Sequence, residues 1–319
     1  MIGVGANSVD YVYRLPVTPE PDGPNAKVRV SSHSILCGGQ NATALCTCAA
    51  MGLRTKYVGS TGNDHNGQRI RDELARRGVD IGDAITREVP SRFAVILVNE
   101  QSGERMVLWD RAEALTLDEN ELLACGLTSS RVLHVDDEDQ RTAIIAARIA
   151  RAAGLHVTSD IDRMTERTEE LVSEVTIPIF AEHVPRALTG ESDVERALRK
   201  IRRRHAGLLC VTLGPRGSVA LDGDRFHYEP AFRVNAVDTT GAGDVFRGAF
   251  IFGLLRGDPT RDLLRFANAA AAVSVTRLGA IDGVPTFDET KRMMGTLPQS
   301  ALDSGLLALG TPNAESLKQ

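Results

Sequence analysis

The 319-residue sequence is poor in aromatic residues, which make up 4% of it and include a single tryptophan. Its five cysteines form no C-x-x-C pair, so neither a disulfide framework nor a paired zinc motif is indicated. No apolar run reaches the roughly 18 residues that span a bilayer, and no basic segment followed by an apolar one opens the chain. We therefore expect a cytoplasmic protein with reduced, buried cysteines and no membrane partner.

The sequence also lacks a large excess of charge of either sign. Its 42 acidic and 37 basic residues leave a net charge of only −5. This balance creates no field that attracts nucleic acid. The strong basic run at residues 199–204 follows a helical pattern and is interpreted as a solvated face. The phosphate-binding loop motif G-x-x-x-x-G-K-[ST] is missing as well, so any phosphate group would have to bind at a different kind of site.

Strand and helix patterns alternate along most of the chain. Strands are predicted at residues 57–61, 131–135 and 156–159, and helices at residues 66–77 and 141–153. This alternation predicts an α/β fold with a doubly wound parallel sheet and helices on both faces. Ligands of such sheets gather at the carboxyl ends of the strands.

Two further regions, at about residues 11–36 and 92–110, carry strand patterns outside this alternation. We expect them to form a small antiparallel β lid over the substrate. Exposed apolar lid strands also favour a homodimer that forms through the lid. One domain is expected over residues 1–296, followed by a mobile tail at residues 297–319 that is rich in small and polar residues.

The stretch Asp238-Thr-Thr-Gly-Ala-Gly-Asp244 joins a predicted strand at residues 231–237 to an apolar helix pattern. Gly241 and Gly243 lack Cβ atoms, so the backbone N–H groups around Ala242 can approach an oxyanion. The N-terminus of the helix adds unpaired N–H groups and a positive dipole end. Asp244 can then take a proton from a hydroxyl that attacks a phosphate. The alternative is an ordinary glycine-rich turn with a capping aspartate.

Three candidate positions for a substrate precede this stretch. Asp10 ends a strand predicted at residues 2–10 and can accept hydrogen bonds from hydroxyl groups, or can cap a turn. Gly38 and Gly39 begin a helix and let a ligand reach the backbone, although a plain tight turn would have the same sequence. Asp136 follows the strand at residues 131–135 and is a substrate candidate, unless its acidic cluster is a solvated loop.

Residues 238–244 resemble the C-terminal signature of the ribokinase-like (PfkB-type) carbohydrate kinases, and Gly38-Gly39 with the following helix resembles their N-terminal one. The likeness extends from about residue 2 to about residue 285. It implies ATP-dependent transfer of the γ-phosphoryl group to a sugar hydroxyl, with Asp244 as base and Gly241, Ala242 and Gly243 as anion hole. It also implies that Thr43 joins Asp10, both glycines and Asp136 at the sugar.

The resemblance implies further binding roles. ATP is expected to contact Thr212, Gly214, Gly217 and Asn268, the last at the adenine edge. A monovalent cation such as K⁺ is expected near Asp238, Thr240, Arg277 and Gly279. Mg²⁺ should accompany ATP because unshielded triphosphate repels an attacking oxygen.

The sequence departs from the family pattern at two places. Ribokinase carries Asn near Thr43, so the usual amide contact with the sugar is replaced by the hydroxyl of Thr43, or by Asn41 or Gln40, which argues against ribose as the substrate. Many relatives have an Asn-x-x-Glu motif that organises Mg²⁺, whereas this chain has Ala181 and Val184 and retains only Glu182 as an acidic group nearby. Two alternatives therefore stay open: a nucleoside kinase of the same fold, and a non-catalytic sugar- or nucleotide-binding protein.

Overall fold

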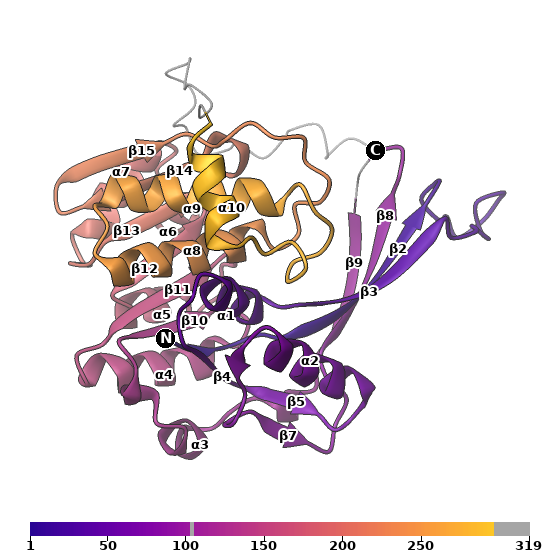
Figure 1. The fold of residues 1–319 in the computed structure, drawn as a ribbon, viewed down its shortest axis with the longest axis horizontal. Coiled ribbons are helices and arrows are strands. Elements are labelled where there is room, and N and C mark those ends of the chain that lie inside the picture. Colours follow the sequence, from indigo (N-terminus) through magenta and orange to yellow (C-terminus); the bar gives the residue numbers. More distant parts are fainter. Residues whose placement is uncertain (103–104, 297–319) are drawn as a thin grey trace.

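The computed structural model describes residues 1–102 and 105–296, and the predicted tail at 297–319 lies outside them. A nine-stranded sheet forms the centre of the main body, in the order β15-β14-β13-β12-β11-β10-β1-β4-β6 (Figure 1). Its strands are β1 (Ile2–Val4), β4 (Thr55–Val58), β6 (Val79–Asp80), β10 (Val132–Asp136), β11 (His156–Ile161), β12 (Ile177–Ala181), β13 (Leu209–Thr212), β14 (Ser218–Asp222) and β15 (Arg225–Glu229). All neighbouring pairs from β6 to β13 are parallel, and only β14 and β15 pair antiparallel. The predicted doubly wound sheet is confirmed.

Helices cover both faces of this sheet because alternate strand residues point into two separate apolar cores. The helices are α1 (Gln40–Ala50), α2 (His65–Arg76), α3 (Glu119–Ala124), α4 (Gln140–Ala152), α5 (Thr168–Glu174), α6 (His183–Thr189), α7 (Val194–Arg202), α8 (Ala242–Arg256), α9 (Thr260–Ser274) and α10 (Phe287–Met294). One core joins the sheet to α4–α7 and the other joins it to α1, α2, α8 and α9. All five cysteines are buried and free, as predicted. No helix of the described ranges is both long and apolar enough to cross a membrane.

The lid is a separate four-stranded sheet in the order β3-β2-β8-β9, and it projects from the main body (Figure 1). Its strands are β2 (Ser8–Leu15), β3 (Ser32–Gly38), β8 (Phe93–Asn99) and β9 (Arg105–Asp110). The two predicted antiparallel pairs, β2 with β3 and β8 with β9, are both present. They are joined by a parallel pairing of β2 with β8, which makes one continuous surface.

Three predicted strands differ from the structure: two have other boundaries, and the third is not a strand. Residues 2–10 break after β1, so Asp10 lies inside lid strand β2 rather than at the end of a main-sheet strand. Residues 57–61 break at Gly59, and β5 (Ser60–Gly62) pairs with β7 (Ile85–Arg87) in a two-stranded sheet. The predicted strand at 231–237 is wrong, because Val237 N and Asp238 N both donate to Val275 O at the end of α9 instead of joining a sheet.

Candidate active site

The glycine-rich turn and α8 meet as predicted. Gly241 is the N-cap residue of α8 and has left-handed backbone angles, with φ 75° and ψ 0°. A Cβ atom at Gly241 would lie 2.5 Å from the Cβ atom of Ala280, so any side chain would collide there. No side chain caps α8 within the described residues, so N–H groups of its first turn stay available to an anion.

Asp244 belongs to this first turn, is half-buried, and lies beside the buried pair of Asp160 and Arg247. The carboxyl groups of Asp160 and Asp244 share a hydrogen bond. Arg247 Nη2 lies 2.6 Å from Asp160 Oδ1, and the two side chains of this ion pair are 4% and 2% exposed. Burial raises the pKa of Asp244 to about 6, while Arg247 and the hydrogen bond from Asp160 act in the opposite direction. Asp244 is therefore ionised at neutral pH and can accept a proton.

Asp238 ties two loops together beside the glycine turn. Its Oδ1 atom accepts from Thr240 N at 2.9 Å, and its Oδ2 atom accepts from Gly279 N at 2.9 Å. These backbone bonds outweigh burial and lower the pKa of Asp238. The predicted cation-site residues Asp238, Thr240 and Gly279 are therefore neighbours. The guanidinium of Arg277 instead bonds Glu289.

Arg105 of the lid reaches across to the same turn. Its Nη1 atom donates to Thr240 Oγ1 at 2.7 Å, its Nη2 atom donates to Thr239 Oγ1 at 3.3 Å, and Nη1 is 3.8 Å from Asp238 Oδ1. A cleft of about 270 Å³ lies between the lid and the turn, and it is lined by Asp10, Arg105 and residues of both loops. The lid therefore reaches the turn that precedes α8.

The predicted substrate residues Asp10, Gly38 and Gly39 lie together at the base of the lid. A Cβ atom at Gly38 would come within 2.7 Å of Asp10 Oδ2, and one at Gly39 would come within 2.5 Å of Asn7 Cα. Ser8 Oγ donates to Asp10 Oδ1 at 2.6 Å. Burial raises the pKa of Asp10 despite this hydrogen bond. Both glycines are thus needed for close packing around Asp10.

Thr43 and Asp136 are less accessible. Thr43 is fully buried in α1, and its Oγ1 atom has no hydrogen-bond partner among the described residues. Asp136 is 1% exposed; its Oδ2 atom accepts from Ala6 N at 2.6 Å, and its Oδ1 atom accepts from Glu138 N at 3.2 Å. Burial raises the pKa of Asp136 to about 7. Asp136 thus holds the turn after β1, whereas the hydroxyl of Thr43 is unpaired among the described residues and has no contact with solvent.

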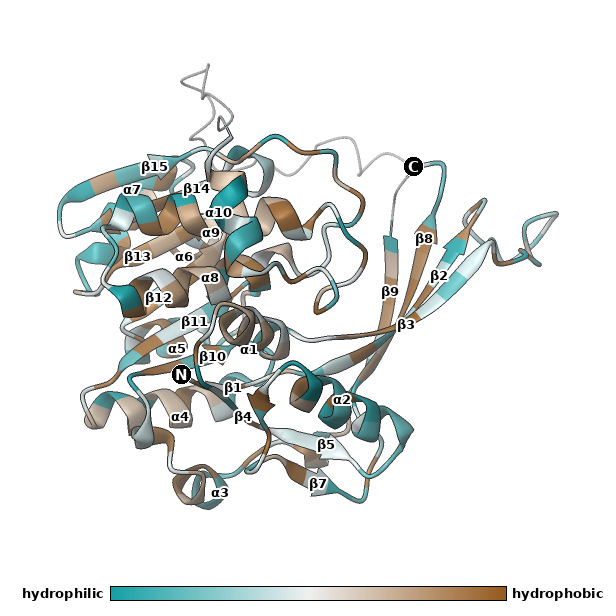
Figure 2. Cartoon of the chain, viewed as in Figure 1, coloured by the Kyte–Doolittle hydropathy of each residue, from teal (hydrophilic) through white to brown (hydrophobic). Residues whose placement is uncertain are grey.

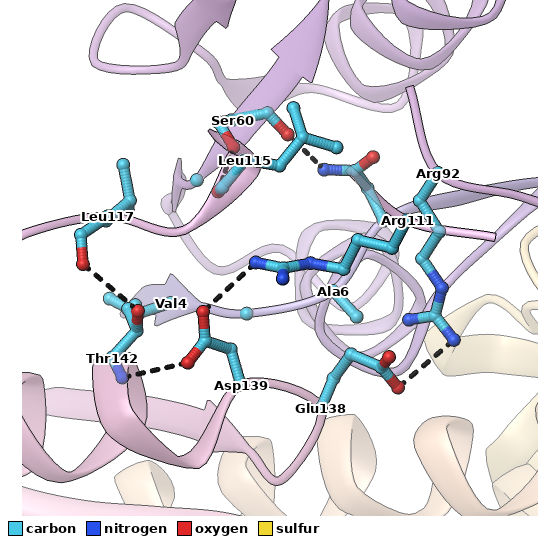
Figure 3. A pocket seen from close by; sticks show the side chains of 13 residues that line it. Val4, Ala6, Ser60, Arg92, Arg111, Leu115, Leu117, Glu138, Asp139 and Thr142 are labelled. Carbon is cyan, nitrogen blue, oxygen red and sulfur yellow. Dashed lines mark hydrogen bonds and ion pairs between the residues drawn. The ribbon is translucent and has the colours of Figure 1, made fainter. Parts of the chain in front are cut away.

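A second cavity lies at the carboxyl ends of β1, β4 and β10 and has a charged wall (Figure 3). Arg92 pairs with Glu138 at 3.1 Å, and Arg111 pairs with Asp139 at 3.0 Å. Ala6 and other small residues after β1 form the floor (Figure 3). Arg92 also lowers the pKa of Asp10, although burial dominates that group, so this wall is electrostatically coupled to the base of the lid.

The predicted nucleotide residues gather around the end of β15. Thr212 ends β13, and the turn after it contains Gly214 and Gly217 at positive φ. A Cβ atom at Gly217 would lie 2.1 Å from Glu229 O, and Asn268 Nδ2 donates to this same oxygen at 2.9 Å. Both the glycine turn and α9 therefore lie against the carbonyl group of Glu229.

Glu182, the predicted Mg²⁺ candidate, has a charged neighbour. Its carboxylate accepts a hydrogen bond from Arg216 in the turn between Gly214 and Gly217. The described residues contain no group of three or more His, Cys, Asp or Glu side chains that could hold a metal ion.

The sequence prediction did not include Arg105 or Arg247. Arg105 could not be placed because its partners Thr240 and Thr239 lie 135 and 134 positions away in the sequence. Arg247 did leave a signal: it is a lone charge in the middle of the apolar run that follows Val245. A charge in such a run is rarely buried without a partner, and this one pairs with Asp160.

Comparisons with known proteins agree with this arrangement. The model of the pfkB family carbohydrate kinases matches residues 8–287. The chain is 26% identical to a ribokinase of Haemophilus influenzae, with 90% of this chain and 95% of the relative covered. It is also 26% identical to a nucleoside kinase of Methanothermobacter thermautotrophicus, with 91% and 93% covered. The crystal structure of a putative ribokinase from Agrobacterium tumefaciens superposes with a TM-score of 0.82 at 27% identity and covers 92% of this chain and 96% of that one.

Proposed function

The chain belongs to the pfkB family of carbohydrate kinases and is an ATP-dependent kinase, and we propose that it phosphorylates a sugar hydroxyl at the start of α8. The observation that carries this proposal is the position of Asp244. Its carboxylate lies in the first turn of a helix that no side chain caps within the described residues, directly after the turn of Thr239 and Thr240 that lines the cleft under the lid.

In the proposed reaction Asp244 accepts the proton of the sugar hydroxyl as that oxygen bonds to the γ-phosphorus. The bond from the γ-phosphorus to the bridging oxygen breaks, and ADP leaves with the electron pair. The N–H groups around Gly241, Ala242 and Gly243 stabilise the negative charge of the transferred group. Arg105 bonds the rim of the same turn from the lid, so lid closure and exclusion of water are coupled to this site.

The sugar is placed against Asp10, Gly38 and Gly39, with Thr43 as a buried hydroxyl partner. A sugar is favoured over a nucleoside because the adjoining cavity is lined by two arginine–carboxylate pairs (Figure 3). Such pairs offer both donors and acceptors to hydroxyl groups, whereas a base prefers an apolar slot. Asp136 supports this wall by holding the backbone of Ala6.

ATP is placed between the turn at Gly214 and Gly217 and the helix that carries Asn268, beside Thr212. Mg²⁺ enters as the MgATP complex and shields the phosphate charge, and Glu182 would bind it through water beside Arg216. K⁺ would lie between the loop of Asp238 and Thr240 and the loop of Arg277 and Gly279, on oxygen ligands. We further propose a cytoplasmic location for the enzyme.

A substrate panel tests the proposed function. ADP formation is measured with MgATP and a panel of ketoses, aldoses, sugar phosphates and nucleosides, with and without K⁺ and with excess EDTA. We expect one sugar to give turnover well above all nucleosides and EDTA to abolish it. A nucleoside as the preferred substrate would contradict the sugar assignment, and binding without turnover would favour the non-catalytic alternative.

We also propose that the protein forms a homodimer through its lid. Strand β9 exposes four consecutive apolar side chains, Met106, Val107, Leu108 and Trp109, each at least 49% exposed. Figure 2 shows apolar residues along the neighbouring strand β8. An exposed apolar edge strand is a surface that normally becomes covered.

The mass in solution, measured by light scattering, tests the dimer. We expect about twice the 34.4 kDa of one chain. Leu108→Lys should shift the mass to that of a monomer, because it places a charge in the covered surface. Leu123→Lys, at a leucine of α3 that is 58% exposed, serves as the matched control and should remain a dimer. A monomeric wild-type protein at micromolar concentration would contradict the proposal.

A further inference from the structure

We propose that Arg247 is a positioning residue of the reaction centre, which together with Asp160 keeps Asp244 ionised and oriented beneath the glycine turn. This inference rests on the proposed function, since it concerns the base of that reaction. It adds two residues that do not touch the substrate but control the group that does.

The position of Arg247 in α8 puts it next to Asp244. The two residues are three apart in the helix, so their side chains emerge on the same face. The residues around Arg247, from Val245 to Gly253, are all buried. A guanidinium group in such surroundings is costly unless charged partners compensate it, and its ion pair with Asp160 supplies this compensation.

The guanidinium also lies directly under the turn that would hold the phosphoryl group. A Cβ atom at Gly243 would be 2.6 Å from Arg247 Nη1, so the backbone of the turn packs directly against the guanidinium group. Arg247 Nε is buried and has no hydrogen-bond partner among the described residues. Glycine at position 243 therefore serves two needs, because it exposes N–H groups to an anion and makes room for a cation behind them.

Four charged groups face the Asp244 carboxylate: Arg247 of the same helix, Asp160 and Asp162 at the end of β11, and Asp10 of the lid. Three of these are acids, so Arg247 is the cation that opposes them. Burial raises the pKa of Asp160 and Arg247 lowers it. Arg247 therefore acts on both carboxyl groups of the pair.

The rate of the reaction should depend on pH through the ionisation of Asp244. Asp244 works as a base only when ionised, so the rate falls as the pH drops through its pKa, which is about 6. Removal of Arg247 takes away the largest effect that lowers this pKa. The pKa then rises, and a smaller fraction of the enzyme is active at neutral pH.

The test compares Arg247→Gln, Arg247→Lys and Asp160→Asn with a control, Arg196→Gln, which alters an ion pair on the surface of α7. The readout is kcat/KM against pH with the sugar that gives the highest turnover in the panel. The wild-type acidic limb is expected near pH 6. Arg247→Gln should move this limb upward by at least about one pH unit and lower kcat at pH 7 about tenfold.

The other two variants distinguish an electrostatic role of Arg247 from a purely steric one. Arg247→Lys keeps the charge and should restore most of the wild-type limb, whereas a purely steric role would not be rescued. Asp160→Asn removes an acid beside Asp244 and leaves a neutral hydrogen-bond donor, so its limb should lie below the wild-type position. Should Arg247→Gln fail to fold, Asp160→Asn decides the question, because a limb that stays at or above the wild-type position would overturn the inference. Limbs that coincide in all variants would overturn the inference.

A second readout separates this inference from the proposed function. Carboxyl ¹³C resonances of labelled aspartates are titrated in wild type and Arg247→Gln, and Asp244 is assigned through Asp244→Asn. An upward shift of the Asp244 pKa supports the inference even when no sugar is phosphorylated. An unchanged titration would overturn it even in an active kinase.

Discussion

Asp244→Asn is expected to lower kcat by about 10³-fold, which corresponds to about 4 kcal/mol of transition-state stabilisation. The amide has nearly the shape of the carboxylate but cannot take the proton of the attacking hydroxyl. It can still hydrogen-bond Asp160, so the packing at the start of α8 should be kept. ATP affinity is expected to change less than threefold, because Asp244 acts on the sugar hydroxyl.

Initial rates with saturating sugar and MgATP, together with ATP titration by calorimetry, check this prediction. Asp262→Asn is the matched control, because Asp262 is likewise the third residue of its helix but is exposed at the start of α9. The control should keep the wild-type rate. A kcat for Asp244→Asn within tenfold of wild type would show that another group accepts the proton.

Gly241→Ala is expected to produce the second large effect, a loss of at least about 10²-fold in kcat/KM. The residue must keep a positive φ of 75°, which costs an alanine about 1–2 kcal/mol, and its Cβ atom would lie 2.5 Å from that of Ala280. The turn must therefore shift, and its N–H groups would no longer point toward the transferred phosphoryl group.

Gly257→Ala separates the two causes. Gly257 ends the same helix with φ 77°, and a Cβ atom there would meet no atom within 4 Å. It carries the same backbone strain without the collision, so it should lose stability but keep activity. Thermal unfolding and steady-state rates of both variants are compared. Equal activity losses in the two variants would mean that strain in α8, and not the turn, sets the rate.

The parts of the fold that follow from local patterns could be predicted from the sequence. Alternating strands and helices imply the parallel sheet, and the glycines at 241 and 243 mark the start of α8 without any tertiary information. Residues 231–237 show the limit of this approach. Their apolar composition suits a strand, yet the main sheet already ends at β15, and the segment bonds to the end of α9 instead.

The site could be predicted only where one residue type has one plausible role. Asp244 was found because an acid after two glycines at a helix start suggests a base. Arg105 acts through Thr240, which lies 135 positions away, and no spacing rule relates the two residues. Asp136 was predicted at the correct edge of the sheet, but only the structure shows that its oxygens bind backbone N–H groups.

The measurement that tests the central claim most directly is ³¹P NMR of the wild-type enzyme with MgATP and the preferred sugar of the panel. The account predicts a new phosphomonoester resonance that grows in equal amount with ADP, and its absence with Asp244→Asn. ADP formed together with inorganic phosphate alone would contradict transfer to a sugar. An unchanged ATP spectrum with every sugar, although ATP binds, would contradict the assignment of this site as a kinase centre.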